Sequence, residues 1–254
     1  MAIEHVSGGS SAPLAAGDEV GVVVLCAMRA EAAPIIAGLG LEAGDPPWDE
    51  RLPMGYWRHP VDDVTLVTNG VDARTGADLI GTTPATLATA AICEHLDPDA
   101  LLIAGAAGGR SGATEIGRVH MVDRAFHHDR RIPLDGFGEY AIGPEALCHC
   151  ADVARACGAV ISTGSTGNGL DTLAGEMAFF DRHGVVVKDM ETASVAWTAG
   201  RYGTRVVALR AITDYFDRAQ PEEQFVANFD LAVGRLAGVT VPVVAALVAG
   251  AMRF

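Results

Sequence analysis

Two apolar, β-branched runs separated by an alanine-rich segment constrain the fold of this chain more than any other feature. The first run is residues 185–187 and the second is 206–212, which only Arg210 interrupts. Such runs are typical of strands that are buried on both faces. Residues 191–202 between them have the periodicity of a helix, and Gly203 is placed to end it. We therefore predict a strand–helix–strand unit with two parallel strands.

Two carboxylates follow these predicted strands. Glu191 comes shortly after the first strand, and Asp214 comes directly after the second. Open α/β sheets bind ligands outside the carboxyl ends of their parallel strands, so both side chains can face one crevice. Each acid also has an ordinary explanation, because Asp214 suits a turn and Glu191 suits a helix N-terminus. The pattern by itself leaves both interpretations open.

A third acid, Glu31, has a comparable position near the start of the chain. Residues 19–26, EVGVVVLC, predict a buried strand, and residues 31–39 predict a helix that Gly40 ends. Glu31 would then lie in the first turn of a helix that follows a strand, at the same sheet edge. A carboxylate there is also favoured by the helix dipole alone.

The rest of the chain continues the alternation of strands and helices. Residues 1–18, rich in Gly, Ser and Ala, predict a flexible tail, and residues 19–254 predict one α/β domain. Residues 225–236 begin the predicted C-terminal helices, and the apolar segment 239–252, which contains Pro242, predicts a terminal helix packed on the core. Further strands are expected at 55–59, 64–68, 100–103, 119–126 and 159–162, and further helices at 84–95 and 143–156.

Two glycine-rich segments follow predicted strands. Residues 105–109 predict a turn that allows close approach of the backbone to a ligand. Residues 163–171 predict a polar loop that could offer backbone groups to a flat heterocycle, although a plain surface loop explains them equally well. Neither segment is a dinucleotide fingerprint, and the chain has no P-loop motif.

Composition excludes several classes of function. The formal net charge of −14 argues against binding to nucleic acid or to an anionic membrane surface, and no apolar run reaches 18 residues. Five cysteines and no visible signal peptide predict reduced thiols in a cytoplasmic protein. We expect no metal site at Cys148 and Cys150 or at His127 and His128, because side chains at these spacings diverge on a helix or a strand.

Eight short motifs occur in an order that is known from one family. The motifs are AMRAEA at 27–32, GVD at 70–72, GTTPATLAT at 81–89, AGAAGG at 104–109, HDRRIP at 128–133, STGNGLD at 165–171, KDME at 188–191 and RAITD at 210–214. In these motifs the sequence resembles the 5′-methylthioadenosine nucleosidases, and most closely their plant-type branch, within the nucleoside phosphorylase/hydrolase superfamily.

The resemblance implies a three-layer α/β/α fold with a central mixed sheet, and a homodimer. It implies hydrolysis of an N-glycosidic bond without a cofactor, as in methionine salvage, to give adenine and a 5-substituted ribose. By resemblance, Asp214 protonates N7 of the purine, Glu31 activates the attacking water, and Glu191 binds the ribose hydroxyls. We therefore expect a raised pKa for Asp214 in the complex with substrate, since an acid must keep its proton at neutral pH.

The resemblance also assigns five residues to substrate binding. Met190 would pack against the sugar, Asn168 and Leu170 would form the base pocket, and Pro133 and Phe137 would line the 5′-substituent pocket of the partner subunit. A sixth position departs from the family. Ala106 stands where the family has Ser or Thr near the ribose or the water, and the lost hydroxyl could alter the rate or the substrate preference.

Three other functions stay open from the sequence. A phosphorylase would bind phosphate where Glu31 lies, but a carboxylate there repels phosphate, and only Arg29 and Arg74 favour it. The substrate could also be a different 5′-modified nucleoside. A nucleoside-binding protein without turnover is the third alternative, although the three acids argue against it.

Overall fold

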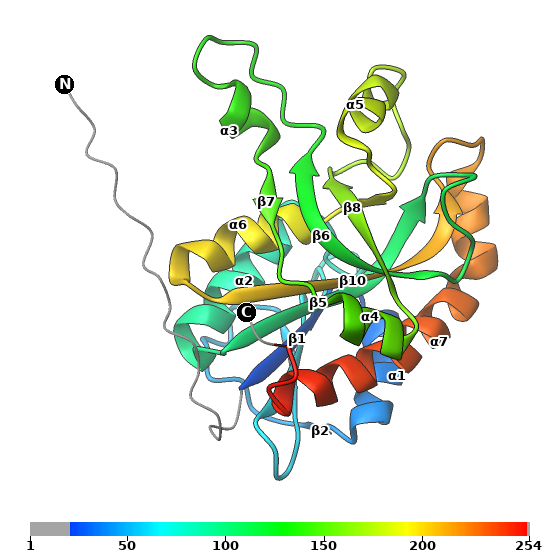
Figure 1. Ribbon diagram of the computed structural model, residues 1–254. Helices are drawn as coiled ribbons and strands as arrows, with labels where there is room; N and C mark the ends of the chain where they lie inside the picture. Colours follow the sequence, from blue (N-terminus) through cyan, green and yellow to red (C-terminus); the bar gives the residue numbers. More distant parts are fainter. Residues whose placement is uncertain (1–20, 253–254) are drawn as a thin grey trace.

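The computed structural model describes residues 21–252 (Figure 1). The predicted tail at 1–18 therefore lies outside the described residues. The strands are β1 Val22–Cys26, β2 Glu42–Ala43, β3 Gly55–Arg58, β4 Val64–Thr68, β5 Ala100–Gly109, β6 Val119–His127, β7 Glu145–Ala146, β8 Val160–Thr166, β9 Val187–Asp189 and β10 Arg205–Tyr215. The helices are α1 Arg29–Leu39, α2 Thr82–Leu96, α3 Gly138–Ile142, α4 Ala151–Cys157, α5 Glu176–His183, α6 Thr192–Tyr202 and α7 Pro221–Val248.

The strands form one mixed sheet that closes on itself at one end. Its order is β10-β6-β8-β9-β5-β1-β4-β3-β2, with β7 beside β6 and a further pairing of β10 with β5. That further pairing joins β10, β6, β8, β9 and β5 into a ring. Strand β1 pairs in parallel with β4 and β5, whereas β10 is antiparallel to β6. The predicted mixed sheet is confirmed.

Helices cover both faces of the sheet because the central strands are apolar on both. In β1, Val22 and Val24 belong to one buried cluster, and Val23 and Leu25 belong to the other. The first cluster includes side chains of α1, α4 and α7, and the second includes side chains of α2 and α6. The three-layer α/β/α architecture expected from the resemblance is confirmed.

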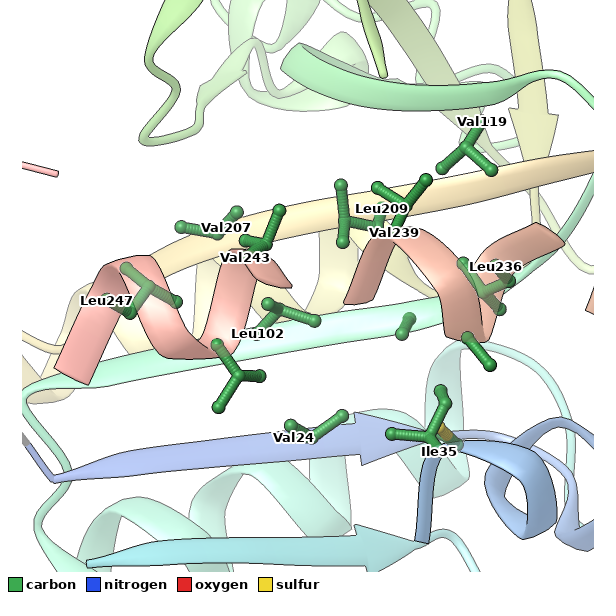
Figure 2. Close-up of a cluster of buried hydrophobic side chains, with 14 of the residues drawn as sticks. Val24, Ile35, Leu102, Val119, Val207, Leu209, Leu236, Val239, Val243 and Leu247 are labelled. Carbon is green, nitrogen blue, oxygen red and sulfur yellow. The ribbon is translucent and has the colours of Figure 1, made fainter. Parts of the chain in front are cut away.

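Helix α7 is the main cover of one face. Figure 2 shows Leu236, Val239, Val243 and Leu247 pointing from α7 onto the strands that carry Val24, Leu102, Val207 and Leu209. The C-terminal helices expected at 225–236 and 239–252 form one continuous helix, which contains Pro242 in its interior. By length and hydropathy it could cross a membrane, but half of its most apolar window is buried inside the protein. Packing on the sheet thus accounts for its composition.

The predicted parallel relation between β9 and β10 is wrong. Both strands pair with β5, but β9 does so in antiparallel and β10 in parallel orientation. Strand β9 has only three residues, and it extends the parallel pairing of β6 and β8. The local pattern predicted the helix between the two strands correctly, but closure of the ring set their directions.

Three other boundaries differ from the sequence predictions. Residues 105–109 are not a turn, because β5 continues through them and pairs with β10. Residues 163–166 belong to β8, so the polar loop begins only at Gly167. The predicted helix at 143–156 is reduced to α4, because β7 occupies 145–146 and Gly143 ends α3. Cys148 and Cys150 therefore precede the helix.

Candidate active site

Glu31 is a buried carboxylate held by two backbone N–H groups. It lies in the first turn of α1, as predicted, and its side chain is only 2% exposed. One oxygen accepts a hydrogen bond of 2.7 Å from the N–H of Ala106, and the other accepts one of 3.0 Å from the N–H of Met28. Burial raises the pKa of Glu31 to about 7, and the charge of Glu191 adds to the rise. The group is therefore poised to exchange a proton near neutral pH.

Ala106 contributes to the site through its backbone. Because its N–H binds Glu31, the residue positions the carboxylate whatever its side chain is. Its neighbour Gly105 leaves the space that this approach needs. A Cβ at Gly105 would lie 2.4 Å from Nη1 of Arg210 and 3.1 Å from Oε1 of Glu31. Glu31 and Arg210 therefore both approach the backbone of β5 at Gly105, and their charges interact there.

Arg210 connects Glu31 with Glu191. Its guanidinium is 1% exposed and lies 3.3 Å from a carboxylate oxygen of Glu191 and 3.0 Å from one of Asp189. The other oxygen of Glu191 accepts a 2.9 Å hydrogen bond from the N–H of Gly81. Burial raises the pKa of Glu191 against the lowering charge of Arg210. Glu191 thus lies directly before α6, as predicted, but as part of a buried ion-pair network.

Asp189 anchors this network to the start of α6. Its carboxylate accepts hydrogen bonds from the hydroxyl of Thr166 at 2.6 Å and from the N–H groups of Glu191 and Thr192, both at 3.2 Å. It also binds the hydroxyl of Thr192. These contacts satisfy the free N–H groups at the helix start and hold Glu191 in place.

Asp214 is aimed by an irregularity in β10. It lies inside the strand rather than past its end, which corrects the sequence prediction. Ile212 pairs with Ala107 and Asp214 pairs with Gly108, so Thr213 is an extra residue between them. Such bulges redirect side chains. A Cβ at Gly108 would lie 2.8 Å from an oxygen of Asp214, so only glycine leaves room for this carboxylate.

The environment of Asp214 makes its carboxyl group harder to ionise than an exposed aspartate. The side chain is 1% exposed, and one oxygen accepts a 2.8 Å hydrogen bond from the hydroxyl of Thr213. Burial raises its pKa, while the Thr213 hydrogen bond and the charge of Lys188 oppose the rise. The predicted direction of the shift is thus found in the free protein. A protonated carboxylic acid in such a place can act as a general acid.

A small cavity of about 20 Å³ connects Asp214 with other predicted site residues. Leu170, Met190 and Asp214 line it together with Gly108, Gly169, Lys188, Asp189 and Phe216. Because Met190 precedes Glu191, the cavity lies next to the network around Arg210. The three acids therefore form two adjacent groups, with Glu31 and Glu191 around Arg210 and Asp214 in the cavity.

Asn168 lies in the loop that borders this cavity but does not line it. Its side-chain oxygen accepts hydrogen bonds of 3.0 Å from both the N–H and the hydroxyl of Thr82. Its backbone N–H donates to Asp129 at 2.7 Å. Asn168 thus connects the start of α2 with the loop after β6, and its expected contact with the base stays a prediction.

Pro133 and Phe137 lie in the segment around α3, which projects from the same end of the molecule as α5 (Figure 1). Phe137 is 45% exposed and packs its ring edge against Tyr140. Neither residue lines the cavity of Asp214. Their position on a projecting segment is compatible with the predicted role in a partner subunit, which stays a prediction.

The two arginines that could favour phosphate, Arg29 and Arg74, are both paired with acids. Nε of Arg29 lies 2.7 Å from Asp78, and its side chain is 56% exposed. Arg74 is 87% exposed and lies 3.6 Å from Asp72.

Within residues 21–252, no group of three or more His, Cys, Asp or Glu side chains could hold a metal ion.

Sequence reasoning missed two residues of the site. The sequence analysis noted Arg210 only as an interruption of an apolar strand, and it noted Lys188 only as part of the KDME motif, with no role for either side chain. A charged residue inside a strand that is otherwise buried on both faces was the available signal, because burial of a charge requires a partner. The identity of the partners, Asp189 and Glu191 for Arg210, depends on the tertiary structure.

Glu31→Gln is expected to change how stability depends on pH. The pKa of Glu31 is raised on folding from about 4.3 to about 7, so its contribution to stability is lost as pH rises through this range. The variant lacks this titration. Its free energy of unfolding relative to the wild type should rise by about 2–3 kcal/mol between pH 5 and pH 8. Urea denaturation at a series of pH values measures it, and parallel curves for the two proteins would contradict the assigned pKa.

Comparison with known proteins places this site in a family. A model of the phosphorylase superfamily matches residues 21–245. The chain is 34% identical over 228 residues to a 5′-methylthioadenosine nucleosidase of Arabidopsis thaliana, covering 88% of this chain and 85% of that protein. It is 28% identical over 220 residues to a 5′-methylthioadenosine/S-adenosylhomocysteine nucleosidase of the same plant, covering 85% of this chain and 87% of that one.

The fold agrees with this relationship. The solved structure of the Arabidopsis thaliana 5′-methylthioadenosine nucleosidase in apo form superposes with a TM-score of 0.86 at 32% identity. The superposition covers 91% of this chain and 97% of that one. The chain therefore belongs to the phosphorylase superfamily and, within it, to the family of 5′-methylthioadenosine nucleosidases.

Proposed function

We propose that this protein hydrolyses the N-glycosidic bond of purine nucleosides of the 5′-methylthioadenosine type, releasing adenine and a 5-substituted ribose. The observation that carries the proposal is the set of three buried carboxylates, Glu31, Glu191 and Asp214, whose pKa values are all raised by burial. Two relatives are nucleosidases that are named for such substrates. The proposed reaction uses water and these side chains.

Asp214 acts as the general acid. Cleavage of the bond leaves a purine anion, which is a poor leaving group until N7 is protonated. A buried carboxylic acid in a narrow cavity can supply that proton, and general acid catalysis of this kind is worth about 10²–10⁴-fold in rate. Leu170 and Phe216 place apolar side chains in the wall of this cavity, beside Asp214.

Glu191 and Glu31 act on the sugar and the water. The ribose becomes positively charged in the transition state, and a carboxylate fixed beside its hydroxyls stabilises that charge. Gly81, Arg210 and Asp189 hold Glu191 and its helix for this role. Glu31, with a pKa of about 7, can take a proton from the attacking water at neutral pH.

The charges of the site favour hydrolysis over phosphorolysis. Phosphate requires cationic groups, but Arg29 and Arg74 are paired with Asp78 and Asp72 at exposed positions. Arg210 is buried between Asp189 and Glu191. The carboxylate of Glu31, once ionised, would repel a phosphate anion placed beside it, by several kcal/mol at short range.

Adenine release tests the proposal directly. Methylthioadenosine, S-adenosylhomocysteine and adenosine are each offered to the purified protein with and without phosphate. We expect rapid release from methylthioadenosine at a rate that phosphate leaves unchanged. Release that requires phosphate would identify a phosphorylase, and no release from any purine nucleoside would indicate a binding protein.

We further infer that the protein is a cytoplasmic homodimer that acts in methionine salvage. Leu134, Phe137 and Tyr140 on the projecting α3 segment are 45–63% exposed, which favours contact with a second copy. All five cysteines are free, which is compatible with a reducing compartment. Light scattering tests the assembly, and a mass of a single 26.3 kDa chain would contradict it.

A further inference from the structure

Lys188 is the only lysine in the chain, and the other 17 of its 18 basic residues are arginines. It lies in β9 and is only 4% exposed. A buried ammonium is costly unless its donors are satisfied, so a single lysine at a buried position needs a specific explanation. Arginine is the basic residue at all 17 other positions of this chain, so the use of lysine at this one position calls for a structural reason.

The ammonium of Lys188 binds three consecutive backbone carbonyls. Its Nζ atom lies 2.8 Å from the oxygen of Gly169, 2.8 Å from that of Leu170 and 2.5 Å from that of Asp171. An ammonium has three donors, and these three carbonyls use all of them. A planar guanidinium cannot converge on three acceptors in this way, which explains why arginine does not replace this residue.

This contact links two walls of the proposed base pocket. Lys188, Gly169 and Leu170 line the cavity on one side, and Asp214 lines it as well. The ammonium interacts electrostatically with Asp214 and also with Glu176, Asp171, Asp129 and His128. Burial lowers the pKa of Lys188, and the four carboxylates oppose this shift.

We propose that Lys188 is a positioning residue that holds the 169–171 loop in a fixed place relative to Asp214 and thereby sets the purine for protonation. The proposal rests on the nucleosidase function proposed above. A misplaced base wall weakens the binding of the purine as well as its alignment with Asp214, and a misplacement of about 1 Å can cost about 10²-fold. Glycine makes this loop conformationally permissive, and the three hydrogen bonds to one ammonium restrain it.

Two substitutions separate positioning from simple charge. Lys188→Met removes both the charge and the donors, whereas Lys188→Arg keeps the charge but loses the convergence on three carbonyls. We expect KM for methylthioadenosine to rise about tenfold or more in both variants, because the base wall is misplaced in both. Arg110→Met, which removes a cation paired with Asp181 outside the cavity, is the matched control and should keep the wild-type KM.

The pH profile of kcat supplies a second readout. Lys188 stabilises ionised Asp214, so its removal should raise the pKa of Asp214 further. Activity is lost as Asp214 gives up its proton, and this loss should move to higher pH in Lys188→Met but not in Lys188→Arg. A Lys188→Arg protein with the wild-type KM would show that Lys188 acts only as a charge and would overturn the positioning role.

A measurement on the wild type covers the case in which the variants do not fold. Reductive methylation followed by peptide mass analysis reports on Lys188 alone among the side-chain amines. Bound adenine should slow this methylation several-fold, because it holds the loop against Asp214. A methylation rate that adenine leaves unchanged would show that the Lys188 contact is independent of the base site and would contradict the proposal.

The failure of the positioning role can be told from the failure of the proposed function. Absence of adenine release by the wild type would reject the proposed function, whereas release with wild-type KM in Lys188→Arg rejects only the positioning role.

Discussion

Asp214→Asn is expected to lower kcat for methylthioadenosine by about 10²–10⁴-fold while leaving the affinity for the substrate largely intact. The amide has the shape of the acid and can still accept the hydrogen bond from Thr213. It has no proton to give to N7. Because the side chain is buried with a raised pKa, the neutral amide should also be tolerated by the fold.

Single-turnover rates and calorimetric binding of methylthioadenosine measure the two quantities separately. Asp217→Asn is the matched control, since Asp217 follows the same strand but binds Ser111 and is outside the cavity. The control should keep the wild-type kcat. An equal loss of binding and turnover in Asp214→Asn would mean that Asp214 only binds the substrate.

Arg210→Leu is expected to destabilise the protein by about 3–5 kcal/mol. Removing one partner of a buried ion pair leaves an uncompensated charge, and Arg210 neutralises two carboxylates, those of Asp189 and Glu191. It also donates a 3.0 Å hydrogen bond to the hydroxyl of Thr192. Urea denaturation at pH 7 measures the loss.

The deficit should shrink in acid. The charge of Arg210 lowers the pKa of Glu191, so without it this pKa rises further above its ordinary value. A group with a raised folded-state pKa loses its contribution to stability as pH rises, so the variant suffers most at neutral pH and least below about pH 4.

The control for Arg210→Leu is Arg118→Leu. Arg118 is 45% exposed and lies 3.4 Å from Glu115, and such surface pairs contribute less than about 1 kcal/mol. A loss in Arg210→Leu no greater than in this control would contradict the buried network.

The secondary structure that local patterns predict was largely correct. The start of α1 and of α6, and with them the positions of Glu31 and Glu191 in a first turn and before a helix, follow from local sequence. The simpler explanation of Glu31, a carboxylate that is favoured at a helix N-terminus, also holds in part, because its side chain accepts a hydrogen bond from the N–H of Met28 at the helix start. The same carboxylate reaches Ala106 on a distant strand, which local sequence does not show.

The failures share one cause, which is pairing between distant strands. The ring of β10, β6, β8, β9 and β5 reversed the direction of β9 relative to β10. It also extended β5 and β8 through glycine-rich residues that look like turns in isolation, at 105–109 and 163–166. Glycine can mark the close approach of another backbone as well as a turn, and only the neighbouring strand decides between the two.

By itself, the sequence determined the alternation of strands and helices, because hydrophobic periodicity is a local property. The resemblance carried by its motifs predicted the three layers and the roles of Glu31, Glu191 and Asp214. Only the tertiary structure decided that the extra residue Thr213 directs Asp214 toward Gly108. It also decided that Arg210 lies between Asp189 and Glu191, and that Lys188 donates hydrogen bonds to three backbone carbonyls. These features depend on strand register and on the partners available to buried charges. Both arise when segments far apart in the chain come together, and no local pattern records them.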